Sequence, residues 1–215
     1  MKNLLFKNEN FSLCQVTGEN ELNKIVRFVL SVNYRHHLNQ DFPLEELPTL
    51  LKQDMLSLNH SVFYVIYDNI GEMVGTIKSQ KWDKKIKLCI EKDFDIDLKH
   101  LIRVLPNQPK EVFHIGRFAI DQERIREDIA LRKNRITIFK MLLLHALKPV
   151  CQGDGSKIAL CECDEKLYIG LQRLGLDIKP IGTSKLYMGS NTVPIYSNNI
   201  GIQGFMNKNN HLCYV

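Results

Sequence analysis

The sequence predicts an α/β protein of the layered α+β kind, in which a mixed, mostly antiparallel sheet carries helices on both faces. Three observations lead to this prediction. Two segments with helical spacing of apolar residues come first, a β-hairpin follows them, and a strand–helix–strand unit comes later. The last unit makes two strands parallel within an otherwise antiparallel sheet, because a crossover helix returns the chain to its starting edge.

Length and composition are those of a soluble globular domain. The chain has 215 residues, of which 44% are hydrophobic and 25% charged. We expect a single domain over residues 1–215, with 81–110 as an insertion or a short helix. No segment reaches the roughly 18 apolar residues of a membrane span, and the N-terminal apolar patch is too short for a signal sequence. We therefore expect a cytoplasmic protein.

The cysteines and the net charge exclude some classes of function. The six cysteines are scattered without zinc spacing, so we expect reduced thiols and no metal site. Cys161 and Cys163 share one face of a predicted strand, which favours two core thiols. A formal charge of +5 is below that of a dedicated nucleic-acid binder, so we expect no nucleic-acid partner, although an acidic partner is favoured.

The elements follow in a clear order along the chain. Amphipathic helices are predicted at 19–39 and 44–58, and a hairpin at 61–67 and 73–78. A strand is predicted at 111–120 and an almost wholly apolar helix at 136–150, ended by Pro149. A buried strand at 157–163, a helix at 164–175 ended by Gly175, and an antiparallel segment at 185–195 complete the prediction.

Two motifs in this order resemble the GNAT N-acyltransferase superfamily. The hairpin segment VIYDNIGEMVGTIK is similar to the hairpin pattern of that superfamily, and LQRLGLDI is similar to the end of its late helix. The matching residues are Gly71, Val74, Gly75, Thr76, Lys78, Leu174, Gly175 and Leu176. The resemblance spans roughly residues 19–195 and implies the GNAT fold and acyl transfer.

The strand HIGRFAI is similar to a strand of acyl-homoserine-lactone synthases and the related N-acyl amino acid synthases. Gly116, Arg117 and Phe118 stand at the corresponding places, and Arg27-Phe28 resembles a second short motif of these enzymes. The resemblance implies transfer of a fatty acyl group from acyl carrier protein, or acyl-CoA, to the amine of an amino acid or similar small molecule. It implies no tightly bound cofactor, and we also consider product release at a membrane surface.

The segment after this strand, DQERIREDIALRKNR, departs from most GNAT enzymes because it contains no glycine. Those enzymes hold the pyrophosphate of CoA on a glycine-rich loop and the helix N-terminus that follows it. We therefore do not expect a CoA site of the usual form. Basic residues here would suit the acidic carrier protein and its phosphopantetheine arm instead. They are Arg124, Arg126, Arg132, Lys133 and Arg135.

Two further departures limit the resemblance. The acidic residues after the first helix lack the spacing with which the lactone synthases bind S-adenosylmethionine, so we do not expect homoserine lactone as a product. The tyrosine that many GNAT enzymes use as an acid is Leu171 here. Tyr168 lies one turn earlier, either as a substitute acid or as a packed aromatic.

The candidate base is His114, at the place where the similar enzymes have glutamate. An imidazole titrates near neutrality and so can accept the proton of an attacking amine, but a lone histidine in an apolar strand can also be a core residue. Glu111 and Glu162 are the alternative bases, and backbone donors between splayed strands would bind the oxyanion.

Strand alternation places Gly116 and Phe118 on the face of His114 and Arg117 on the other, unless a bulge intervenes. Arg117 must find a partner, either an acid on the first two helices or a substrate carboxylate.

Apolar residues of the helix 136–150, including Phe139, Leu142 and Leu143, are predicted either to line an acyl tunnel or simply to form core. Two other functions stay open. One is a short-chain acetyltransferase that uses acetyl-CoA, and the other is a non-catalytic GNAT-like module that binds a lipid or a protein.

Overall fold

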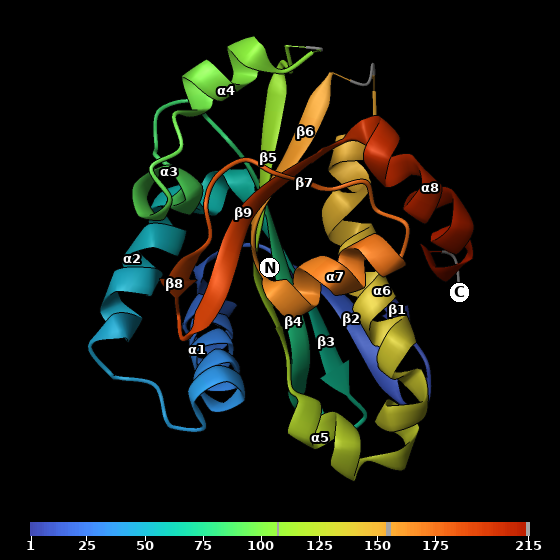
Figure 1. The fold of residues 1–215 in the computed structure, drawn as a ribbon. Helices are drawn as coiled ribbons and strands as arrows, with labels where there is room; N and C mark the ends of the chain where they lie inside the picture. Colours follow the sequence, from blue (N-terminus) through green and yellow to red (C-terminus); the bar gives the residue numbers. More distant parts are fainter. Residues whose placement is uncertain (107, 154–155, 214–215) are drawn as a thin grey trace.

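The computed structural model describes residues 1–106, 108–153 and 156–213. Within them the chain forms one sheet with the strand order β1-β2-β3-β4-β5-β6-β9-β7, and β8 pairs with β9 (Figure 1). The strands are β1 (Lys2–Lys7), β2 (Phe11–Val16), β3 (Ser61–Asp68), β4 (Met73–Lys81), β5 (Glu111–Ile120), β6 (Lys157–Asp164), β7 (Lys179–Pro180), β8 (Lys185–Tyr187) and β9 (Ser190–Asn198).

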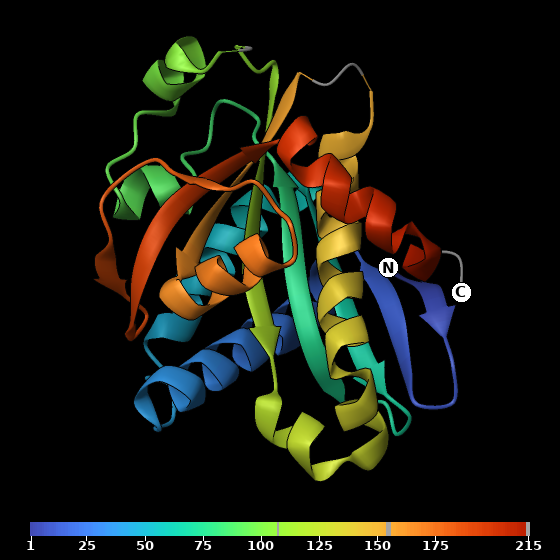
Figure 2. The ribbon, with the colours of Figure 1, turned by 45° about the vertical axis from the view of Figure 1, so that its right-hand side comes forward.

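Helices cover both faces of the sheet (Figures 1 and 2). On one face lie α1 (Leu22–Leu38) and α2 (Glu46–Ser57), and on the other α6 (Ile129–Cys151) and α8 (Asn199–Asn209). The shorter helices are α3 (Cys89–Asp93), α4 (Leu98–Val104), α5 (Gln122–Glu127) and α7 (Glu165–Arg173). Described strand pairs are antiparallel except β5–β6, which α6 connects. The predicted fold class is confirmed.

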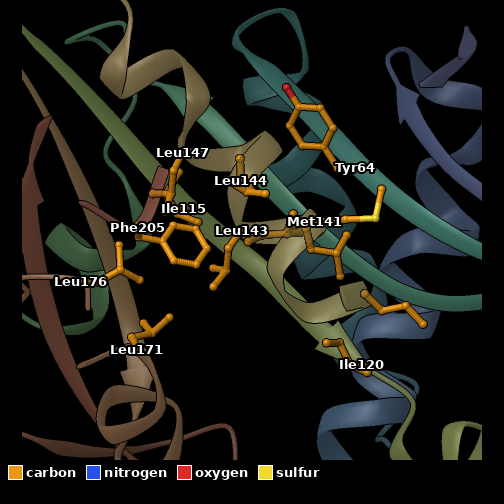
Figure 3. Packing of buried hydrophobic residues seen from close by; sticks show 14 of the residues in the cluster. Tyr64, Ile115, Ile120, Met141, Leu143, Leu144, Leu147, Leu171, Leu176 and Phe205 are labelled. Atoms are coloured by element: carbon orange, nitrogen blue, oxygen red, sulfur yellow. The ribbon is translucent and has the colours of Figure 1, made fainter. Parts of the chain in front are cut away.

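The composition of α6 follows from its position between the sheet and α8. Its buried residues occur all round the helix because one side packs on β3, β4 and β5 and another on α8. Figure 3 shows Leu143 and Leu147 of α6 near Ile115 of β5 and Phe205 of α8. By contrast, α1 buries a single stripe that includes Ile25 and Leu30 against β2 and β3, and exposes its other side.

Several boundaries differ from the prediction. The N-terminal hairpin β1–β2, the short strand β7 and the helix α8 were not predicted. The predicted segment 185–195 is a hairpin rather than one strand, because Met188 and Gly189 adopt positive φ angles of 46° and 80°. Helix α6 continues past the predicted end at Pro149 to Cys151, so Pro149 lies within its last turn. Gly175 ends α7 at a φ of 88°, as predicted.

The segment after β4 carries α3 and α4 and builds a third, smaller core cluster. Trp82, Ile90 and Leu98 from this segment pack against Val112 of β5 and Leu160 of β6. This cluster packs against the first residues of β5 and β6, where the two strands are paired. Among the helices of the described residues, none combines the length and the apolar character that crossing a bilayer demands.

Candidate active site

A β-bulge in β5 places Arg117 in the site. Thr76 of β4 pairs with Ala119 and Lys78 pairs with Gly116, so Arg117 and Phe118 together oppose one residue of β4. Arg117 takes a left-handed φ of 52°. Regular alternation would have put Arg117 on the face away from His114. The bulge is the exception considered above, and both residues line the same pocket.

The bulge also turns Phe118 toward α6. Its ring lies 5.2 Å from that of Phe139, edge to face, and both rings pack at the border of the main core. The expected alternation, with Phe118 on the face of His114, applied to a strand without a bulge; with the bulge, Phe118 contacts Phe139 of α6 and still lines the pocket of His114 at its edge.

Arg117 is held by Asp54 of α2. The Nε atom of Arg117 donates to one oxygen of Asp54 at 2.8 Å, and Nζ of Lys78 donates to the other at 2.8 Å. The side chains of Arg117, Lys78 and Asp54 are 8%, 4% and 0% exposed. Burial opposes the charge of Asp54, but Arg117 and Lys78 outweigh it and lower the pKa of this carboxyl. Of the two partners considered for Arg117, the structure shows the acid on the first two helices.

His114 and Glu162 form a second buried polar pair. His114 belongs to the last residue pair of the β5–β6 ladder, and Glu162 lies two residues beyond that pair on β6. The Nε2 atom of His114 lies 2.9 Å and 2.8 Å from the two carboxylate oxygens. Burial opposes ionisation of Glu162, but His114 outweighs it and lowers the pKa of Glu162.

The open edge of the His114 ring lies over Gly116. Because an ionised carboxylate only accepts hydrogen bonds, Nε2 donates to Glu162 and Nδ1 is the atom left for a substrate. A Cβ atom at position 116 would lie 3.0 Å from Cε1 and 3.5 Å from Nδ1 of His114. A side chain at position 116 would therefore cover this edge of the His114 ring.

These groups line a pocket at the place where the pairing of β5 and β6 ends, named the polar pocket for the charged side chains in its wall. Its volume is about 750 Å³ including its open mouth. The lining residues are Val29, Asn33, His37, Lys78, Cys89, His114, Gly116, Arg117, Phe118, Cys161, Glu162, Asp164, Leu167, Tyr187, Met188, Ser190 and Thr192. In the described part of the chain no cluster of His, Cys, Asp and Glu could hold a metal ion.

Sequence reasoning missed Tyr187 and the residues of α1 in this pocket. Burial raises the pKa of the Tyr187 hydroxyl, which bonds to the carboxyl of Asp93. Asn33 and His37 follow Val29 along α1 at helical spacing, so one face of that helix reaches the pocket. That spacing is a usable signal for α1, whereas nothing local in the sequence marks Tyr187.

An apolar pocket of about 500 Å³, including its opening, adjoins the polar one. The two share Phe118, Cys161 and Leu167, and the exposed lining atoms of the second are all apolar. Its other lining residues are Ile77, Ile115, Leu143, Leu147, Ala159, Leu171, Leu176, Ile178, Ile195, Tyr196, Ser197 and Ile202. Figure 3 shows how those from β5, α6 and α7 converge.

Only some predicted residues of α6 reach this pocket. Leu143 lines it, whereas Leu142 packs against Gly75 and Phe139 against Phe118.

The structure places Glu111, Arg27, Phe28 and Tyr168 outside both pockets. Glu111 forms ion pairs with two lysines at the start of β5. Arg27 is exposed on α1, because the helix turns it away from the sheet, and Phe28 packs at the edge of the α1 core. The Tyr168 hydroxyl accepts a hydrogen bond from Gln172 at the surface.

The predicted carrier-binding residues divide into two groups. Arg124 and Arg126 are engaged locally, the first with Asp68 at 2.6 Å and the second with the backbone oxygen of Gln122 at 3.2 Å. The others are exposed on the first turns of α6: Arg132, Lys133 and Arg135.

The helix N-termini in this region are occupied by the chain's own carboxylates. Asp121 accepts hydrogen bonds from two backbone N–H groups of α5, each at 3.1 Å. Asp128 accepts from two backbone N–H groups of α6, at 2.7 Å and 3.0 Å. An anion bound at either terminus would have to displace an aspartate and would meet its negative charge.

Solved structures with this architecture include acyl-transferring synthases. The N-acyl amino acid synthase FeeM from uncultured soil microbes is 16% identical, with a TM-score of 0.54 over 87% of this chain and 89% of FeeM. TofI, in a complex with an inhibitor and MTA, is 14% identical, with a TM-score of 0.55 over 90% and 95%. The AHL synthase LasI is 11% identical, with a TM-score of 0.52 over 90% and 94%.

No family model matches the sequence, and no curated protein does. The structural similarities therefore establish the fold: the chain folds like N-acyl amino acid and acyl-homoserine-lactone synthases, as its motifs predicted.

We predict that Asp54→Asn destabilises the protein by about 3–5 kcal/mol, because two buried cations lose their shared counter-charge. Urea unfolding measures this change. The control is Glu123→Gln, which removes a 57% exposed partner of Arg35 and should cost less than about 1 kcal/mol. Equal stability of the two variants would contradict the assigned role of Asp54.

The same carboxylate should give the wild type a characteristic acid sensitivity. Since its pKa is lowered by folding, the stabilisation is present above the unfolded value of about 3.9 and is lost as the pH falls further. In Asp54→Asn this part of the pH dependence should disappear from the unfolding free energy.

Proposed function

We propose that the protein is an N-acyltransferase that moves a fatty acyl group from a thioester to the amine of an amino acid or similar small molecule by direct aminolysis. One observation carries this proposal. The buried His114–Glu162 pair lines a polar pocket that adjoins an apolar pocket through Phe118, Cys161 and Leu167. Such an arrangement suits a polar acceptor on one side and an acyl chain on the other.

The chemistry needs only groups that these pockets contain. With the acyl chain in the apolar pocket, the thioester carbonyl lies at the junction and the neutral amine attacks it from the polar side. Nδ1 of His114 accepts the proton that the amine sheds, and Glu162 stabilises the imidazolium. The C–N bond forms, the C–S bond breaks, and the imidazolium returns the proton to the departing thiolate. Backbone N–H groups between the separated strands are suited to bind the oxyanion.

The charge of the pocket wall supports an acceptor that bears a carboxylate. Lys78 and Arg117 bring two positive charges to the wall, and Asp54 supplies one carboxylate between them. A substrate carboxylate would complete the hydrogen bonding of these cations and would hold the adjacent amine within the pocket.

Two observations support a carrier protein as the acyl donor. The Asp121 and Asp128 caps disfavour the pyrophosphate of CoA at the helix N-termini. Arg132, Lys133 and Arg135 are exposed on the first turns of α6, near these N-termini. Their positive charges suit contact with the acidic surface of a carrier protein.

The decisive experiment is to incubate the protein with long-chain acyl carrier protein, long-chain acyl-CoA or acetyl-CoA and a set of amines, and to detect N-acyl products by mass spectrometry. We expect products with the long-chain carrier donor. Acetylation alone, from acetyl-CoA, would identify a short-chain acetyltransferase instead, and no product with any donor would contradict enzymatic acyl transfer.

Glu162→Gln should lower kcat by about 10²–10⁴-fold, because the amide no longer stabilises a protonated His114. The control is His100→Gln, a histidine exposed on α4 that should leave the rate unchanged. Steady-state kinetics with the best donor measures both. An unchanged rate in a folded Glu162→Gln protein would exclude the pair from the reaction.

Amino acids should be acylated at least about tenfold faster, in kcat/KM, than their carboxamides, because the amide cannot neutralise Lys78 and Arg117. Competition between an amino acid and its amide in one reaction measures the ratio. A ratio near unity would show that the carboxylate is not recognised.

A further inference from the structure

The pairing of β6 and β9 shows which residues of the apolar pocket lie far from its junction with the polar pocket. Cys161 lies at the junction of the two pockets, and Ala159 lies two residues earlier on β6, about 7 Å away at 3.3 Å per residue. Ala159 pairs with Ser197 of β9. Ile202 of α8 follows Ser197 closely in the chain, and it lines the apolar pocket but not the polar one. The pocket therefore runs from Cys161 toward α8.

Ile202 is fixed in this position by the start of α8. A Cβ atom at Gly201 would lie 2.7 Å from both the backbone oxygen of Asp177 and the hydroxyl of Ser197, so only glycine allows so close an approach. The N–H of Asp177 donates to the oxygen of Gly201 at 2.9 Å, and the Asn198 side chain caps the helix at 2.8 Å. Ile202 is completely buried as a result.

We propose that Ile202 sets the maximum length of the acyl chain by closing the far end of the apolar pocket. This inference rests on the proposed acyl transfer and adds to it a residue that determines donor specificity. An aliphatic chain that enters past Cys161 meets the side chain of Ile202 between β9 and α6. Because protein interiors are closely packed, a chain one methylene too long has no space to occupy.

The test uses a series of saturated acyl thioesters of increasing length with three variants. Ile202→Ala enlarges the end of the pocket, so the kcat/KM ratio of a donor just too long to the optimal donor should rise about tenfold or more. Ala159→Val adds atoms at the same end and should shift the optimum toward shorter chains by a similar factor.

The matched control is Ile138→Ala, which removes the same atoms from another completely buried isoleucine on α6 that lines neither pocket. It should lose stability without a change in chain-length preference. A folded Ile202→Ala protein with the wild-type length profile, or an equal shift in Ile138→Ala, would overturn the proposal.

A binding measurement separates this inference from the proposed function. Calorimetric titration with acyl-pantetheine thioesters reports chain-length preference without any turnover. If no acceptor is acylated but Ile202→Ala binds longer chains than the wild type, the function fails and the length limit stands. If the wild type transfers acyl groups but the length profiles of binding coincide, the length limit fails and the function stands.

Discussion

The geometry of the site depends on the ion pairs that the Asp54 carboxylate forms with Lys78 and Arg117. This carboxylate links three elements, because α2 carries it, β4 carries Lys78 and β5 carries Arg117. Arg117 has a left-handed backbone at the bulge, a conformation that costs free energy and persists only where neighbouring contacts hold it. The ion pair with Asp54 is such a contact. Because of the bulge, the side chain of Arg117 points toward Asp54 and that of Phe118 toward Phe139.

The separation of β5 and β6 gives the chain one pocket with charged groups in its wall and one whose exposed lining is wholly apolar. Side chains alternate along each strand, so His114 and Glu162 face α1 and α2, whereas Ile115 and Cys161 face the apolar side under α6. The thiol of Cys161 lies between the pockets. Its hydrogen bond with Cys163, together with burial, raises its pKa well above the ordinary value, which keeps it a thiol. Direct attack by the amine fits a site without a reactive thiolate.

The strands around the site could be predicted because their sequences are locally unambiguous. The segment EVFHIGRFAI predicted both ends of β5 correctly, and the predicted hairpin before it covers nearly all of β3 and most of β4. His114 and Glu162 were both identified as candidate bases, but their contact depends on the register of two parallel strands and on the point where the strands separate. Neither the register nor the point of separation can be predicted from the local periodicity of a sequence.

Other parts of the site depend on contacts between distant segments. Asp54 reads as one more polar residue of an amphipathic helix, and only the fold brings it to Arg117, 63 residues later. The bulge was recognised as an exception but not placed, since no glycine marks Arg117 as left-handed. Tyr187 lies in a three-residue strand whose pairing with β9 fixes its position. The helix α8 has a mixed sequence because it packs on α6 through only part of its surface.

The place of α8 in the chain has a consequence for biosynthesis. The strands β3 to β6 and the helix α6 are complete by residue 164, so most of the sheet can assemble on the ribosome before α8 emerges. Until residues 199–209 fold, Ile202 is not in place and the side of the apolar pocket that it lines is uncovered. A nascent chain at this stage exposes apolar side chains, which docking of α8 then buries.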